Sequence, residues 1–236
     1  MGGLAAQPQH HMKTNHRKQG FTLIELLVVI SIIAMLAAGG FAGYSKIMPG
    51  VKANTAATSG RAIHTMLSAW AQDNDQSFPV ATQASNDAFR QLFVKRLVDT
   101  EKLFAIAGDA WHENSPSGDK KGPDNDIGTE PEFQQALMPG ECAWAYVTGM
   151  ETASKSDLPL LANAFTESVG VYAADKKKKG GVFNGIKNAW VTVGGSAKVG
   201  ELSADFKCTD KRGSKSVDVF SNDWGTNPDD VKNPQG

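Results

Sequence analysis

The sequence has few of the residues from which catalytic and metal centres are usually built. Its 236 residues include only five histidines and two cysteines, and three of the histidines fall within the first 20 residues. The other two, His64 and His112, belong to no cluster with the spacing of a metal site. The GxSxG, HExxH and glycine-rich phosphate-binding motifs are also absent. We therefore expect a protein that is not an enzyme and that has no cofactor.

The chain also lacks an excess of basic charge. It has 24 lysines and arginines against 25 aspartates and glutamates. Three of the basic residues, Lys13, Arg17 and Lys18, lie in the first 20 residues, which contain no acid, so 21 basic and 25 acidic side chains remain beyond them. Nucleic-acid-binding proteins usually show a basic patch or stripe. We expect no nucleic-acid partner.

What the sequence does contain is one long apolar run at residues 20–44. Residues 26–44 carry no charge, and these 19 residues would form a helix about 28 Å long. That length is just enough to cross a hydrocarbon core of roughly 30 Å. A cleavable signal peptide is the alternative, but its apolar region is usually about 7–15 residues long and ends at a small-residue site. The run predicts a membrane-spanning helix.

Glu25 is the one acid in this region. A charged side chain costs roughly 2.5–3.5 kcal/mol at the centre of a bilayer, and such residues are rare unless they are paired or functional. Glu25 lies near one end of the run, where the cost is smaller. Its presence still predicts a partner of opposite charge.

Residues 18–28, KQGFTLIELLV, closely resemble the class III signal of type IV pilins and of the pseudopilins of type II secretion. The resemblance implies that prepilin peptidase cuts between Gly20 and Phe21 and methylates the new amine of Phe21. It also implies that Glu25 pairs with the N-terminal amine of a neighbouring subunit during filament assembly. Physically, a cation and an anion in lipid offset each other's desolvation, and their pairing can fix the axial register.

The same resemblance suggests three parts. Residues 1–20 are a cytoplasmic leader, which starts at Met1 or, as the shorter leaders of the family favour, at Met12. Residues 21–45 are the transmembrane and filament-core helix, and residues 46–236 are a periplasmic pilin-like domain that includes the second half of the long helix. Basic residues tend to stay on the cytoplasmic side, which predicts a single-pass inner-membrane protein with a cytoplasmic N-terminus.

The expected fold class is α+β, a pilin-like lollipop in which a long N-terminal helix packs on a small antiparallel sheet. An apolar stripe at helical spacing, Ile63, Met66, Leu67 and Trp70, predicts the docking face of the helix. Pro49 leaves the position of any kink open.

The remaining predictions are a second helix at residues 87–99 capped by Asn86 or Ser85, a polar loop at 113–132, strands at 142–148, 158–161 and 189–193, a hairpin partner at 196–202 after Gly194 and Gly195, and an irregular segment at 209–236.

Cys142 and Cys208 are an even pair in a domain that the resemblance places in an oxidising compartment. Pilins often tie their C-terminal segment to the sheet in this way, so a disulfide between the two is one prediction. Two separate buried thiols are the alternative, because sequence cannot show that the two Cα atoms approach.

Two acidic segments raise the question of calcium. Residues 124–130, DNDIGTE, begin like a calcium loop, but an EF-hand needs a bidentate glutamate at position 12, where this chain has Gln135. A second acidic group is Asn222, Asp223, Asp229 and Asp230. Major pseudopilins are known for a C-terminal calcium site, whose ligands do not match here residue by residue. We expect both segments to be solvated loops.

We therefore interpret the chain as a structural subunit of a periplasmic pseudopilus of a type II secretion system. Its expected partners are prepilin peptidase, other pseudopilin subunits and, indirectly, the inner-membrane assembly platform and its cytoplasmic ATPase. A subunit of a type IV or DNA-uptake pilus is the alternative of the same class. A membrane-anchored periplasmic ligand-binding or enzymatic domain is the alternative of another class, and substitution of Glu25 would distinguish it from a filament subunit.

Overall fold

The computed structural model describes residues 21–116 and 122–236 and divides the chain into two units, one up to Tyr44 and one from Ser45 to Gly236. Helix α1, Leu23–Gln72, contains residues of both units. Gly20, the residue before the predicted cleavage site, lies outside the described residues, as does the rest of the predicted leader.

Helix α1 is 50 residues long and includes Pro49. It ends at Gln72, because Asn74 donates from its side chain to the carbonyl of Trp70 at 2.7 Å and the following Asp75 and Gln76 adopt positive φ. Pro79 then prevents any continuation. The prediction of a long N-terminal helix is confirmed.

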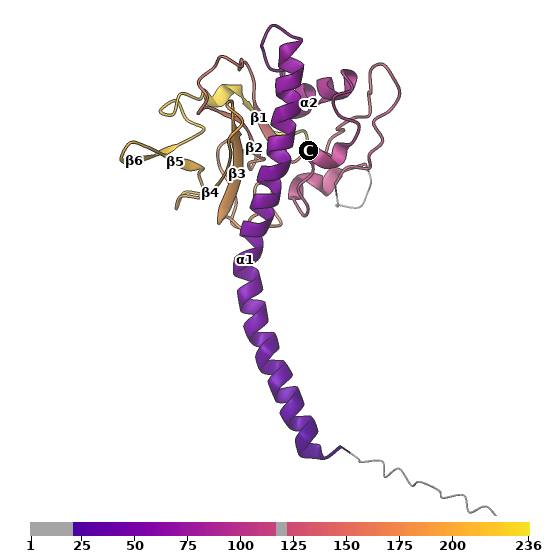
Figure 1. Ribbon diagram of the computed structural model, residues 1–236, viewed down its shortest axis with the longest axis vertical. Helices are drawn as coiled ribbons and strands as arrows, with labels where there is room; N and C mark the ends of the chain where they lie inside the picture. The colour runs from indigo at the N-terminus through magenta and orange to yellow at the C-terminus, as the bar shows by residue number, and fades with distance from the viewer. Residues whose placement is uncertain (1–20, 117–121) are drawn as a thin grey trace, which may run out of the picture. The chain divides into compact units, whose positions relative to one another are not determined.

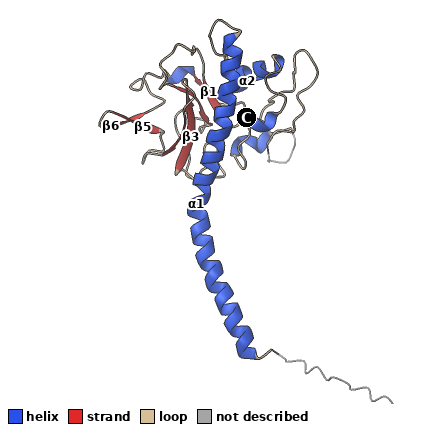
Figure 2. Cartoon of the chain, viewed as in Figure 1, coloured by secondary structure: helices blue, strands red, loops and turns tan. Residues whose placement is uncertain are grey.

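The second unit is built on a five-stranded antiparallel sheet in the order β4-β3-β2-β1-β7. Figure 2 draws the strands in red. The strands are β1 Trp144–Val147, β2 Pro159–Asn163, β3 Lys187–Thr192, β4 Ala197–Glu201 and β7 Val231–Lys232. Strands β1, β2 and β3 are buried on both faces except at Lys187, and they supply much of the core. The four strand segments expected between residues 142 and 202 are all present.

The C-terminal part of α1 crosses this sheet (Figure 1). Ile63 and Leu67 of the predicted stripe are fully buried in the core, and Met66 and Trp70 pack against it. Gly60 permits the close approach, because a Cβ at this position would lie 2.8 Å from the Trp144 ring. The structure confirms an α+β fold with an N-terminal helix packed on an antiparallel sheet.

Helix α2 is shorter than predicted and has a different cap. It spans Ser85–Val94, and its N-cap is Ala84. Asp87 accepts hydrogen bonds from the backbone of Gln83 at 2.9 Å and Ala84 at 3.3 Å. The predicted caps are used elsewhere, since the Ser85 hydroxyl donates to the Trp144 carbonyl and the Asn86 amide donates to the Leu137 carbonyl, both at 2.7 Å.

Two short 3-10 helices, η1 Glu101–Phe104 and η2 Ala110–Asn114, follow α2. The segment at 209–236, which the sequence predicts to be irregular, is largely ordered, so that prediction is wrong. It forms a hairpin of β5 Thr209–Arg212 with β6 Lys215–Asp218, the 3-10 helix η3 Pro228–Asp230 and strand β7. Pairing with neighbours overrides the weak local propensity of these polar residues.

Cys142 and Cys208 are both free and buried, so the predicted disulfide is not formed here. The Cys142 sulfur instead accepts from the Trp144 amide at 3.4 Å. Burial raises the pKa of the Cys142 thiol to about 12 and that of Cys208 well above its ordinary value. The alternative of two separate buried thiols describes the structure.

Within residues 21–116 and 122–236, we find no helix with an apolar stretch long enough to cross a membrane. The spanning segment expected at residues 21–45 stays a prediction.

Candidate functional site

The start of α1 is held by a reciprocal pair of hydrogen bonds between Thr22 and Glu25. The Thr22 hydroxyl accepts from the Glu25 amide at 3.2 Å, and Glu25 Oε2 accepts from the Thr22 amide at 2.8 Å. The hydroxyl also donates to the same oxygen at 2.7 Å. This arrangement is a capping box, which satisfies backbone N–H groups that have no partner inside the helix. Glu25 therefore stabilises the first turn of the helix in addition to carrying a charge.

Glu25 has unused capacity in this arrangement. All the hydrogen bonds that its carboxylate accepts within the described part of the chain go to Oε2, and Oε1 accepts none there. Phe21 lies beside it, because Phe21, Ile24, Glu25 and Val28 line one shallow hollow on the surface of the helix. The structure thus brings together two of the predicted site residues, Phe21 and Glu25.

The helix beyond this cap is apolar and uncovered. Every residue from 21 to 38 is exposed. Large apolar side chains point out on all sides, with Phe21 at 83%, Leu23 at 84% and Met35 at 79% exposure. A helix that is apolar all round is normally buried in a protein core or in a membrane. The apolar side chains of residues 21–38 therefore require lipid or another protein to bury them.

Thr22 is a site residue that the sequence analysis missed. Its signal is present in the sequence, since Thr-x-x-Glu immediately before an apolar run is the pattern of a capping box. The charge of Glu25 alone does not indicate this second role in the capping box.

The two remaining histidines are committed to backbone contacts. His112 is buried, its Nδ1 lies 2.8 Å from the Gly140 carbonyl, and the Ile106 amide donates to its Nε2 at 3.3 Å. Burial lowers the pKa of His112. His64 Nε2 lies 2.8 Å from the Val193 carbonyl. These contacts give both side chains a structural role.

The acidic segment at residues 124–130 is arranged differently from a calcium-binding loop of the EF-hand type. Asp124 and Asp126 accept from backbone amides two residues on, at 2.7 and 3.1 Å. The side-chain amide of Gln135, oriented to satisfy its neighbours, donates to Asp126. Position 12 thus supplies a donor and no ligand.

Asp124 instead meets two glutamates that the sequence analysis did not single out. Glu101, Asp124 and Glu141 each place one carboxylate oxygen within 4.8 Å of the others. It is the one such group of acids, histidines or cysteines in the described chain. Burial, followed by the charges of Glu141 and Asp124, raises the pKa of Glu101 to about 7. Burial, followed by the charge of Asp124, raises the pKa of Glu141.

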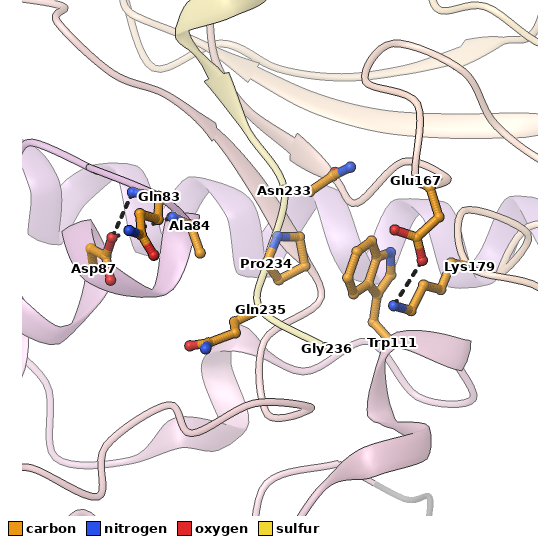
Figure 3. Close-up of a pocket in the computed structure, with 10 residues that line it drawn as sticks. All are labelled: Gln83, Ala84, Asp87, Trp111, Glu167, Lys179, Asn233, Pro234, Gln235 and Gly236. Carbon is orange, nitrogen blue, oxygen red and sulfur yellow. Dashed lines mark hydrogen bonds and ion pairs between the residues drawn. The ribbon is translucent and has the colours of Figure 1, made fainter.

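A separate polar pocket of about 320 Å³ lies between α2, η2 and residues 233–236 (Figure 3). Lys179 forms an ion pair with Glu167 at 3.0 Å and sits 4.1 Å from the centre of the Trp111 ring. Asp87 is engaged in capping α2. The charged side chains that line the pocket are thus engaged in contacts within the protein, and we assign this pocket no ligand.

Residues 15–41 match the family model of the prokaryotic N-terminal methylation motif. The match includes Gly20, Phe21, Thr22 and Glu25. Searches of curated proteins and of solved structures give no significant match.

Proposed function

Residues 15–41 carry the class III prepilin signal of type IV pilin-like proteins, and from this premise we propose that the chain is a structural subunit of a periplasmic pseudopilus of a type II secretion system. In this proposal prepilin peptidase cuts between Gly20 and Phe21 and methylates the amine of Phe21. The subunit then polymerises with other pilin-like subunits through its N-terminal helix.

The observation that carries the proposal is the uncovered apolar helix whose first turn is capped by Thr22 and Glu25. Its exposed side chains are suited to two successive environments, lipid before assembly and the helices of other subunits afterwards. We propose accordingly a single-pass protein of the inner membrane with its N-terminus in the cytoplasm and residues 46–236 in the periplasm.

The cap leaves Glu25 able to bind the amine of a neighbouring subunit. Cleavage would place a positive amine on Phe21, one residue before the cap, at the helix end that already carries partial positive charge. An anion is therefore favoured there, and the unused Oε1 of Glu25 is available to bind a second donor. Pairing with the amine of an adjacent subunit would neutralise both charges while the capping box stays in place.

The test is to delete the gene in the bacterium that encodes it and to complement the strain. We expect the mature subunit in cross-linked periplasmic filaments, and a loss of secreted proteins from the culture medium of the deletion strain. Normal secretion with loss of surface filaments or of DNA uptake would assign the chain to a type IV pilus. A protein that is never processed and never cross-links to itself would favour an anchored periplasmic domain and overturn the proposal.

A further inference from the structure

Three acidic side chains from separate parts of the second unit converge at one point. Glu101 is the first residue of η1, Asp124 lies in the loop after Gly122, and Glu141 precedes β1. One oxygen of each lies within 4.8 Å of the other two. None of the three forms an ion pair with a basic side chain of residues 21–116 or 122–236.

One oxygen in this group is buried without a partner. The Glu101 side chain is fully buried, and its Oε1 accepts from the Leu137 amide at 2.5 Å. Its Oε2 has no hydrogen-bond partner among the described residues. A buried acceptor left in this state costs the full desolvation of the group, so the geometry calls for a donor or a cation beside Glu101.

The other carboxylates are held in place by backbone amides. Glu141 is also fully buried, and its two oxygens accept from the Asp124 amide at 3.0 Å and the Met138 amide at 2.7 Å. Asp124 Oδ1 accepts from the Asp126 amide. Each oxygen retains a second lone pair, and such outer hydrogen bonds are what orient the ligands of metal sites.

We propose that Glu101, Asp124 and Glu141 bind one calcium ion. The site offers only oxygens, which calcium prefers, whereas zinc and copper favour histidine and cysteine. Calcium takes its ligands at about 2.3–2.6 Å, so oxygens up to roughly 5 Å apart can share one ion. Magnesium, with ligands at about 2.0–2.1 Å, would need this group to contract to about 4.2 Å. Asp124 is exposed and leaves room for the water molecules that complete the shell.

The ion would connect two segments that lie outside the sheet to the start of a strand. It would join η1 and the loop at 122–128 to the residue that leads into β1. This differs from the loop predicted at residues 124–130, because only Asp124 of that loop is a ligand. The assignment does not depend on the proposed function, since it involves only the second unit.

The experiment uses the full chain, purified in detergent, treated with EGTA and desalted. Calcium chloride is titrated by calorimetry, and thermal unfolding is followed with and without the ion. We expect one calcium per chain, with a dissociation constant at or below the range of about 10⁻⁴–10⁻³ M that is typical of extracellular calcium modules. The unfolding temperature should rise with calcium concentration.

Variants connect the binding to the site. Glu101→Gln preserves the shape of the side chain and the acceptor for Leu137, and we expect it to weaken calcium binding at least tenfold. Glu132→Gln removes an exposed acid outside the group and should bind as the wild type does. If Glu101→Gln unfolds, Asp124→Asn, at an exposed position, is measured in its place with the same expectation.

Several outcomes would overturn the assignment. The first is a folded wild type that takes up no calcium at about 10 mM, well above the weak limit for such sites. In that case a proton shared between Glu101 and Glu141 would account for the pair. Unchanged affinity in both site variants, or binding of magnesium or manganese without calcium, would overturn it equally.

Discussion

Gly60 of α1 lies directly against the Trp144 ring of β1, so closely that a Cβ on residue 60 would meet the ring at 2.8 Å and Val191 at 2.9 Å. Trp144 and Val191 are both fully buried and central to the core. This contact sets how near the helix comes to the sheet.

Gly60→Ala should therefore destabilise the second unit. Overpacking of a well-filled core costs about 1–3 kcal/mol, and the gain in helix propensity returns up to about 1 kcal/mol. We expect a net loss of up to about 2 kcal/mol in the free energy of unfolding, measured by urea denaturation.

Gly50→Ala is the matched control. It lies in the same helix, but a Cβ there would have no atom within 4 Å. We expect it to stabilise by up to about 1 kcal/mol. Equal effects of the two substitutions would show that propensity, and not the contact with Trp144, decides stability at residue 60.

The capping box allows the two roles of Glu25 to be separated. Glu25→Gln keeps an oxygen that can accept from Thr22, because glutamine also serves in capping boxes, but it removes the charge. We expect the variant to be processed normally and to be absent from cross-linked filaments. Thr22→Ala should instead weaken the cap and keep the charge of Glu25, so it loses about 1 kcal/mol of helix stabilisation and still assembles into filaments. Filaments that contain Glu25→Gln at wild-type levels would contradict the charge-pairing role.

Processing is checked at the N-terminus of the protein recovered from membranes. We expect mass spectrometry to find N-methylated Phe21 as the first residue only in hosts that contain prepilin peptidase. Gly20→Glu should abolish this product because a large charged side chain replaces the glycine before the scissile bond. Gln19→Ala, which leaves that glycine in place, is the control. Normal cleavage of Gly20→Glu would count against the class III signal.

Asp109 should make stability depend on pH. Burial raises the pKa of its carboxyl to about 7, and its Oδ2 has no partner among the described residues. Between the ordinary value of 3.8 and about 7, the folded chain holds a proton that the unfolded chain has lost. The free energy of unfolding therefore falls as pH rises through this window, by on the order of 4 kcal/mol for this group.

Asp109→Asn replaces the protonated carboxyl by a neutral group of the same shape. Urea denaturation in EGTA from pH 4 to 8 should show that the stability difference between wild type and variant shifts in favour of the variant as pH rises. A difference that is constant over this range would contradict the buried-acid assignment.

The cysteines give a simple chemical test. Without any reductant, a thiol reagent should modify neither Cys142 nor Cys208 in the folded protein, because both are buried and their thiol pKa values are raised. Both should react after unfolding in guanidinium. Two unreactive cysteines in the unfolded chain would reveal a disulfide.

Sequence could predict the parts of this fold that depend on local pattern. The stripe from Ile63 to Trp70 and the β3–β4 hairpin around Gly194 and Gly195 follow from periodicity and turn chemistry, and both are found. Strand β7 could not be predicted, because two residues, Val231 and Lys232, gain their strand conformation only by pairing with β1.

The candidate sites divide in the same way. Phe21 and Glu25 are close in sequence and carry a specific motif, so the sequence alone locates them. Glu101 and Glu141 look like ordinary surface acids in sequence. Only the tertiary fold buries both of them beside Asp124, and no local sequence pattern predicts that burial.

The position of β7 has a consequence for the order in which the fold is completed. Strand β1 pairs with β2 on one side and with β7 on the other, and β7 follows every other strand in the chain. Until residues 231–232 have emerged and docked, one edge of β1 offers unsatisfied backbone groups to any passing extended segment. A chain whose C-terminal segment has not yet docked is therefore at greatest risk of wrong pairing, and docking of that segment on β1 ends the exposure.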